Sequence, residues 1–299
     1  MQKKNLSKIK GSCPPIVTPF LGGLVDYEVF EKLLKYHLDK GSHGVLINGT
    51  TGEPSTLTVQ ERNRLVDIAI ETISGRIPVV VATGSQSFSE TERLTKHAVK
   101  AGADALLIVT PYYIKPPQKG LVEYFTKLSL LHDLPWMIYH IPGRAAVSVD
   151  LETLSEIKRR CDNFVGMKHA SSDLGFVSSC LKKLGSDFKI FVGLEELSFP
   201  MMSIGACGLM NAVGNLCPDI LVSLVEAVWN NDLDLARKEH DKLFLLNRSV
   251  FYDTNPIPIK YMMKRIGLIP SNEHRLPMVS ADKELEERLD LVLKSTGLI

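Results

Sequence analysis

The chain has 299 residues, and its 35 Lys and Arg side chains nearly balance its 34 Asp and Glu side chains, which leaves a net charge of +1. Apolar residues make up 44% of the chain and charged residues 23%, a globular composition that excludes an intrinsically disordered protein. The balanced charge disfavours nucleic-acid binding, which needs a strongly basic face. No apolar run approaches the roughly 18 residues of a membrane span, so we expect no nucleic-acid or membrane partner.

Short apolar runs alternate with longer segments of helical period along most of the chain. The eight predicted strands cover residues 13–18, 44–48, 78–83, 105–110, 136–140, 164–168, 189–193 and 208–211. The eight predicted helices between them cover residues 27–40, 59–73, 89–101, 120–132, 151–160, 174–184, 197–204 and 219–230. Gly or Pro recurs near the boundaries, as at Gly75 and Pro78, where a helix must end.

The strand pattern predicts an α/β fold. Several strands are apolar throughout, such as residues 79–81 and 106–109, which is typical of a parallel sheet buried on both faces. Eight strand–helix units predict a (β/α)8 TIM barrel over residues 1–230. An open doubly wound sheet is the alternative, but its first turn is usually Gly-rich, and residues 17–20 contain no glycine. Three amphipathic stretches at 233–250, 256–266 and 283–294 predict a C-terminal helical domain over residues 231–299.

The cysteines and the start of the chain indicate a cytoplasmic protein. The five cysteines are odd in number and scattered, without a C-x-x-C pair, which is typical of reduced thiols: Cys13, Cys161, Cys180, Cys207 and Cys217. The lysines near the start are followed by glycine and proline rather than an apolar segment, so we expect no signal peptide.

The active site of such a barrel lies at the C-terminal ends of its strands. Lys168 closes the strand 164–168 and is expected to project into the barrel mouth. Burial favours the neutral amine of a lysine, a nucleophile able to form a Schiff base with a carbonyl compound. Tyr139 ends the neighbouring strand, where its hydroxyl could relay protons. The alternatives are a salt-bridged lysine and a packing aromatic.

Two further groups suit anionic substrates. Gly49 and Gly52 flank Thr50 and Thr51, the composition of a tight loop that offers N–H groups and hydroxyls to a carboxylate. Arg144 follows the fifth strand and could bind a second carboxylate through two parallel hydrogen bonds. An ordinary strand-to-helix turn and a surface arginine are the alternatives.

A metal site is a competing hypothesis, because His140 and His169 follow Tyr139 and Lys168, and Glu53 could join them as a ligand. Side chains alternate along a strand, so if Tyr139 and Lys168 point inward, the two histidines point away. The chain has no H-E-x-x-H or H-x-H spacing. We therefore predict no metal.

Phosphate binding is disfavoured by the loop after the seventh strand. Barrels often hold phosphate in the loops after strands seven and eight. Here Glu195 and Glu196 follow Gly193 closely, and two carboxylates would repel a phosphate.

Six motifs in order along the chain resemble the dihydrodipicolinate synthase / N-acetylneuraminate lyase family. They are GTTGE (49–53), VTPYY (109–113), YHIPGR (139–144), GMK (166–168), NPIPIK (255–260) and RLPM (275–278). The resemblance implies a (β/α)8 barrel with a C-terminal helical domain, usually a homotetramer. It also implies class I aldolase chemistry on pyruvate without a metal or other cofactor.

The resemblance also implies roles for single residues. Lys168 matches the Schiff-base lysine, and Tyr139 matches the tyrosine that shuttles protons. Thr50 and Thr51 match the loop that holds the pyruvate carboxylate, with Thr51 also linking the tyrosines in a proton relay. Tyr113 matches the tyrosine that crosses a subunit interface to complete the relay in a neighbouring site.

The acceptor side of the site favours the synthases. Arg144 matches the arginine that receives the carboxylate of aspartate semialdehyde, which the lyases usually lack. Gly193 and Met210, at the ends of the seventh and eighth strands, complete the expected substrate-binding residues. Four residues depart from the usual synthase pattern: His169, Ser171, Met210 and Asn211.

The leading hypothesis is a lyase that condenses pyruvate with aspartate semialdehyde through a Schiff base on Lys168, in lysine and diaminopimelate biosynthesis. The first alternative is a related aldolase or dehydratase that acts on a 2-oxo-3-deoxy acid or another aldehyde with the same lysine. An alternative of another class is a barrel that binds a keto acid without catalysis.

Feedback inhibition by lysine is not expected. Lysine-sensitive synthases often have Ser, His, His and Asn at the positions of four residues that differ here: Pro54, Val59, Arg62 and Gln86. Glu90 and Tyr112 are retained.

Overall fold

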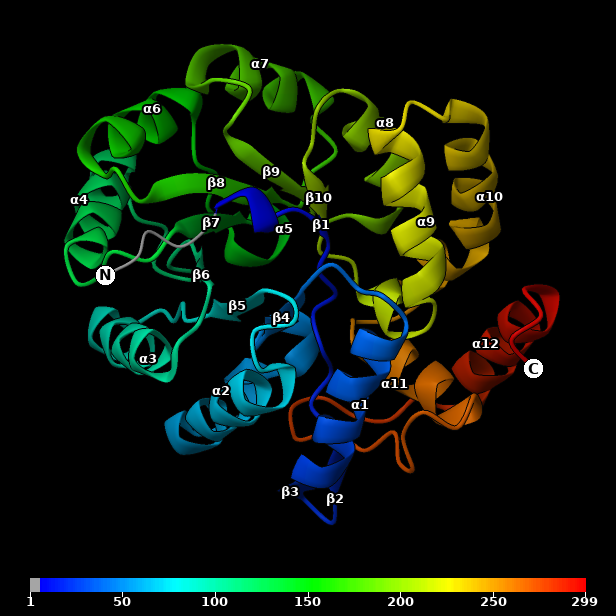
Figure 1. The fold of residues 1–299 in the computed structure, drawn as a ribbon. Coiled ribbons are helices and arrows are strands. Elements are labelled where there is room, and N and C mark those ends of the chain that lie inside the picture. The colour runs from blue at the N-terminus through cyan, green and yellow to red at the C-terminus, as the bar shows by residue number, and fades with distance from the viewer. Residues whose placement is uncertain (1–5) are drawn as a thin grey trace.

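The computed structural model describes residues 6–299, whose centre is an eight-stranded parallel sheet ringed by helices (Figure 1). The strands, in sheet order, are β1 (Gly11–Ser12), β10 (Gly208–Leu209), β9 (Lys189–Val192), β8 (Phe164–His169), β7 (Trp136–His140), β6 (Ala105–Val109), β5 (Val79–Ala82) and β4 (Val45–Ile47). A parallel bridge between Pro15 and Leu46 joins the chain after β1 to β4 and brings the two sheet edges together. The predicted (β/α)8 barrel is confirmed.

The helices that follow the strands lie outside the barrel (Figure 1). They are α1 (Tyr27–Asp39), α2 (Val59–Ile73), α3 (Phe88–Ala101), α4 (Gln118–Ser129), α6 (Leu151–Arg160), α7 (Leu174–Leu184), α8 (Ser198–Ser203) and α9 (Pro218–Trp229). Three predicted helices have the observed bounds because side-chain caps mark their starts: Thr58 before α2, Asp150 before α6 and Asp173 before α7.

Several short elements were not predicted. A hairpin of β2 (Phe20–Leu21) and β3 (Leu24–Val25) follows β1, and the four-residue helix α5 (Pro142–Ala145) follows β7. Short 3-10 turns complete the loops: η1 (Leu6–Lys8), η2 (Thr50–Gly52), η3 (Pro54–Thr56), η4 (Glu195–Leu197) and η5 (Ala212–Asn215). Elements of this length are too short to show a periodic pattern in the sequence.

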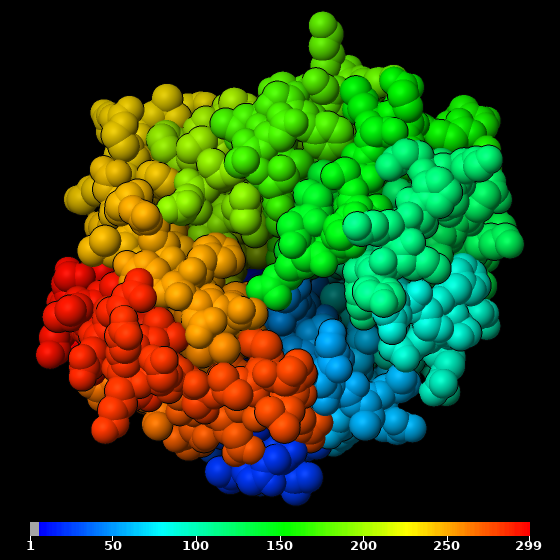
Figure 2. All heavy atoms as spheres, turned by 180° about the vertical axis from the view of Figure 1, so that it is seen from behind, coloured from blue at the N-terminus to red at the C-terminus, as the bar shows by residue number. Residues whose placement is uncertain are grey.

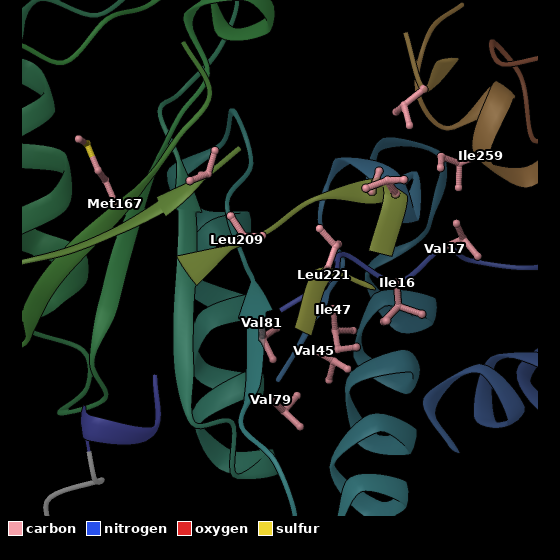
Figure 3. Close-up of a cluster of buried hydrophobic side chains, with 14 of the residues drawn as sticks. Ile16, Val17, Val45, Ile47, Val79, Val81, Met167, Leu209, Leu221 and Ile259 are labelled. Carbon is pink, nitrogen blue, oxygen red and sulfur yellow. The ribbon is translucent and has the colours of Figure 1, made fainter. Parts of the chain in front are cut away.

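Buried apolar side chains form two clusters, one outside and one inside the barrel wall. Val79 and Val81 of β5 belong to the outer cluster between the strands and the helices (Figure 3). Val80, between them, belongs to the inner cluster together with Leu107 and Tyr139. This alternation along each strand determines which strand-end residues can reach the barrel mouth.

Three helices follow α9: α10 (Leu233–Ser249), α11 (Ile257–Arg265) and α12 (Lys283–Ser295). α10 packs against α9, and α11 packs against α12 and η5. The outer core runs without a break from Leu221 through Leu243 to Met262. The division into residues 1–230 and 231–299 therefore stays a prediction. No helix within residues 6–299 has the length and apolarity needed to cross a membrane.

Candidate active site

The C-terminal ends of the strands surround a cavity of about 630 Å³, and a smaller cavity of about 40 Å³ adjoins it deeper in the barrel. Viewed from this side, the molecule is hollowed at its centre (Figure 2). Thr50, Tyr139, Arg144 and Asn255 line both cavities. The inner cavity is also lined by four residues predicted from the sequence to act on or bind substrate: Thr51, Lys168, Gly193 and Met210.

Lys168 lies near the end of β8 and is 4% exposed. Lys168 lies opposite Tyr139 in the register of the adjacent strands β8 and β7. Its Nζ lies 4.5 Å from the centroid of the tyrosine ring. A Cβ added to Gly193 would lie 3.0 Å from Cε of Lys168, so the glycine leaves room for the lysine side chain. The structure therefore brings a buried primary amine and a phenol together at one end of the barrel.

The hydroxyl of Tyr139 contacts Thr50. Oγ1 of Thr50 donates a hydrogen bond to Oη of Tyr139 at 3.4 Å. The resemblance implied a link between the tyrosines through Thr51; in the structure the threonine hydroxyl that contacts Tyr139 is that of Thr50, and the relay role of Thr51 stays a prediction. The η2 turn directs the Thr51 hydroxyl elsewhere, where it accepts a hydrogen bond from Nδ2 of Asn255 at 3.0 Å.

Arg144 lies in α5, directly after the β7 strand end, and its side chain is exposed at the cavity. Its Nη2 donates to the backbone oxygen of Asn255 at 3.3 Å. Asn255 thus contacts both Thr51 and Arg144. Its importance was not predicted, although it opens the NPIPIK motif, because its partners lie far away in the sequence.

Tyr113 does not line either cavity, whereas the preceding Tyr112 lines the outer one. The side chain of Tyr113 is directed to solvent, with 89% of the residue exposed and a left-handed backbone at φ 72°. Within one chain, the structure does not bring Tyr113 to Lys168.

His140 and His169 face outward from the barrel, as the alternation of side chains predicted. Their Nδ1 atoms lie 3.1 Å apart, and both rings pack near Phe176 of α7. Burial, aided by His169, lowers the pKa of His140 to about 4. Burial also lowers the pKa of His169, although Asp173 partly opposes this shift. Both imidazoles are therefore neutral near pH 7.

Glu53, the third residue of the metal hypothesis, is directed away from the two histidines. Its Oε1 lies 2.9 Å from Nζ of Lys260. Across residues 6–299, no group of three or more His, Cys, Asp or Glu side chains is arranged to hold a metal ion.

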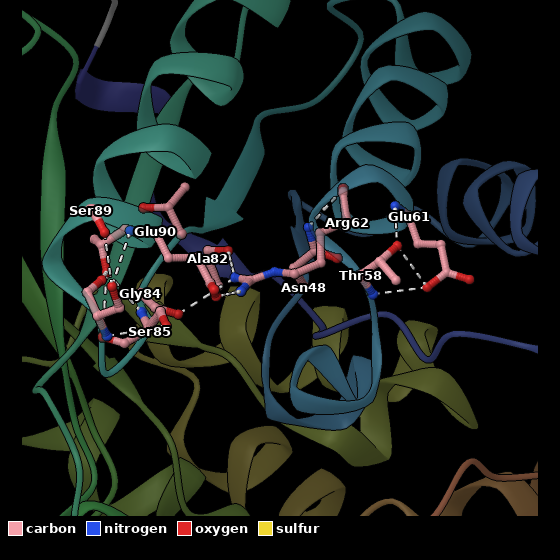
Figure 4. Close-up of polar contacts among 12 residues, drawn as sticks. Asn48, Thr58, Glu61, Arg62, Ala82, Gly84, Ser85, Ser89 and Glu90 are labelled. Atoms are coloured by element: carbon pink, nitrogen blue, oxygen red, sulfur yellow. Dashed lines mark hydrogen bonds and ion pairs between the residues drawn. The ribbon is translucent and has the colours of Figure 1, made fainter.

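The outer cavity extends towards α2 and α3, where Arg62 and Glu90 meet (Figure 4). Arg62 is 4% exposed, and its Nη2 donates to the backbone oxygen of Ala82 at 3.1 Å. Its Nη1 lies 3.8 Å from a carboxylate oxygen of Glu90. Burial lowers the pKa of Arg62, and the charge of Glu90 opposes that shift. The carboxylate of Glu90 therefore already has a cationic partner within the chain.

Comparison with known proteins agrees with this geometry. The family model described as "Dihydrodipicolinate synthetase family" matches residues 8–296. The chain belongs to the dihydrodipicolinate synthetase family. Its fold and motifs thus confirm the resemblance found in the sequence, and the chain is a lyase of the class I aldolase type.

Similar proteins match this family member over almost their whole length. A Thermus thermophilus protein named 4-hydroxy-tetrahydrodipicolinate synthase is 40% identical over 97% of this chain and 97% of its own length. A Syntrophobacter fumaroxidans protein of the same name is 37% identical over 97% of this chain and 99% of its own. The crystal structure of dihydrodipicolinate synthase from Aquifex aeolicus has a TM-score of 0.95 and 36% identity, covering 97% of this chain and 99% of that one.

Proposed function

We propose that this chain is a 4-hydroxy-tetrahydrodipicolinate synthase, which condenses pyruvate with aspartate semialdehyde in lysine and diaminopimelate biosynthesis. The names of its relatives support this activity. The observation that carries the proposal is the placement of Lys168 beside Tyr139, with Thr50, Thr51 and Arg144 around the same space. Both proposed substrates carry a carboxylate, and the site offers a separate anion-binding group for each.

In the first half of the reaction, Nζ of Lys168 attacks the ketone carbon of pyruvate and forms a carbinolamine, which loses water to become an imine. Tyr139 gives and takes the protons that these steps require, and Thr50 passes them along its hydrogen bond to Tyr139. The loop with Thr50 and Thr51 holds the pyruvate carboxylate. Loss of a proton from the methyl carbon then gives an enamine.

In the second half, the enamine carbon attacks the aldehyde carbon of aspartate semialdehyde. A carbon–carbon bond forms, the imine on Lys168 is regenerated, and the aldehyde oxygen takes up a proton to become a hydroxyl. The amino group of the former semialdehyde then attacks the imine carbon, which closes the ring and breaks the bond to Nζ, so that Lys168 is released as the free amine. Arg144, exposed at the outer cavity, binds the carboxylate of the semialdehyde. Gly193 leaves room for the side chain of Lys168, and Met210 lines the same inner cavity.

Turnover with defined aldehydes tests the proposed acceptor. Purified enzyme with pyruvate is expected to consume aspartate semialdehyde faster than a panel of aromatic aldehydes, and to leave 2-oxo-3-deoxy sugar acids uncleaved. Covalent trapping of pyruvate without any turnover of the semialdehyde would exclude the synthase and favour a related aldolase. Absence of trapping as well would favour a barrel that only binds a keto acid.

The active enzyme is proposed to be a homotetramer in which Tyr113 enters the site of a neighbouring subunit. The exposure of Tyr113 (89%) and of Ile114 (71%) supports a contact at this loop. One solved structure at 36% identity is described as the first monomeric dihydrodipicolinate synthase variant, so the oligomeric state of this chain has to be measured.

We further propose a cytoplasmic location and a division of the chain into a catalytic barrel (1–230) and a C-terminal helical domain (231–299). The unpaired state of all five cysteines supports a reducing compartment. The placement of α10, α11 and α12 after the last barrel unit supports the division.

Millimolar L-lysine is expected to leave the activity unchanged. Arg62 lies beside Glu90, so a lysine ammonium would have to compete with a buried guanidinium for the carboxylate. The measurement is the initial rate at subsaturating pyruvate with increasing lysine. Strong inhibition would show that the part of the outer cavity beside Arg62 and Glu90 still binds lysine.

A further inference from the structure

The loop that carries Thr50 and Thr51 lies between two non-glycine residues with left-handed backbones, Asn48 (φ 58°) and Glu53 (φ 53°). This conformation is unfavourable for residues with a Cβ and persists only where the surroundings hold it. Nδ2 of Asn48 donates to the backbone oxygen of Arg62 at 3.0 Å, which holds the first end of the loop.

The second end of the loop is held by a buried ion pair with the C-terminal region. The side chains of Glu53 and Lys260 are 1% and 0% exposed, and Oε1 of Glu53 lies 2.9 Å from Nζ of Lys260. Nδ1 of His274 lies 3.0 Å from the same oxygen. Burial lowers the pKa of Lys260, and the charge of Glu53 opposes that shift. The charge of Glu53 therefore offsets part of the cost of burying the ammonium group of Lys260.

Lys260 also connects the loop to the first strand–helix connection. Its Nζ donates to the backbone oxygens of Thr18, at 3.1 Å, and of Glu273, and lies 4.4 Å from the centroid of the Phe20 ring. Oγ1 of Thr18 in turn donates to the backbone oxygen of Gly52 at 2.7 Å. The ammonium group of Lys260 thus contacts Glu53 directly, and it is connected to Gly52 through Thr18.

We propose that Lys260 is a positioning residue for pyruvate. Through Glu53 it holds the loop 49–53 so that the N–H groups and hydroxyls of Thr50 and Thr51 meet the pyruvate carboxylate. This inference rests on the proposed function and extends it, because it assigns part of pyruvate affinity to a helix outside the barrel. A loop held in place before binding loses less freedom when the substrate arrives.

The test is the pyruvate concentration that gives half-maximal trapping on Lys168 by borohydride. Glu53→Gln and the double variant Glu53→Gln/Lys260→Met are expected to raise this concentration about ten-fold. The extent of trapping at saturating pyruvate and the KM for aspartate semialdehyde are expected to stay within about two-fold, because neither Lys168 nor Arg144 contacts the ion pair. Loss of a residue that only stabilised the fold would not weaken pyruvate binding while leaving the extent of trapping and the KM for aspartate semialdehyde unchanged.

Asp290→Asn is the matched control. Asp290 of α12 pairs with Arg265 of α11 at 2.8 Å and accepts a hydrogen bond from Tyr261 at 3.0 Å. The change weakens the contact between α11 and α12 without touching the loop. It is expected to keep the wild-type half-saturating pyruvate concentration.

The outcomes separate the two proposals. If wild-type enzyme is not trapped by pyruvate and borohydride, the proposed function fails. If wild type is trapped and the folded double variant has the wild-type half-saturation, only the positioning role fails. If Glu53→Gln does not fold, the double variant, which has no uncompensated charge, decides; if that also fails to fold, Lys260 belongs to the fold and the positioning role is overturned.

Discussion

Lys168→Ala is expected to abolish trapping of pyruvate by borohydride and to lower kcat by about 10,000-fold or more. The change removes the amine that forms the proposed covalent bond, and the inner cavity has no second lysine among the residues that line it. Intact-mass measurement after reduction shows the missing adduct, and peptide mapping of the wild type is expected to place the adduct on Lys168.

Lys183→Ala is the control for this experiment. Lys183 lies on the exposed face of α7 and pairs with Glu152, far from the strand ends, so the variant is expected to be trapped like the wild type. Trapping that persisted in Lys168→Ala would show that another amine forms the Schiff base.

Tyr139→Phe is expected to lower kcat by about 100-fold to 1,000-fold, in the range of a lost general acid–base group. The substitution keeps the ring that lies 4.5 Å from Nζ of Lys168 and removes only the hydroxyl. Trapping with pyruvate is expected to become slower and still reach completion, because the amine remains. Stopped-flow rates of imine formation and steady-state turnover measure the two effects.

Two threonine variants refine this prediction. Thr50→Val removes the hydroxyl that donates to Tyr139, whereas Thr51→Val removes one that accepts from Asn255. Thr50→Val is therefore expected to slow imine formation more than Thr51→Val does. The reverse order would support the relay role that the resemblance implies for Thr51.

Much of the site could be predicted from the sequence because its residues lie at strand ends. Lys168 and Tyr139 each close an apolar run, and neighbouring strands of a parallel barrel bring their C-terminal ends to one side. The outward direction of His140 and His169 followed from the same alternation along a strand. Helix bounds were most accurate where a capping side chain, such as Thr58 or Asp150, marked the first turn.

The sequence by itself determined the barrel and the placement of Lys168 and Tyr139 at neighbouring strand ends, because these depend on local periodicity and composition. Only the tertiary structure decided which threonine contacts Tyr139, since the direction of each hydroxyl depends on the geometry of one short turn. The tertiary structure also decided which distant residues contact the loop 49–53. Asn255 meets Thr51 across 204 positions, and Lys260 meets Glu53 across 207 positions. No local pattern records such contacts, because closure of the barrel and packing of α11 against η5 bring these residues together.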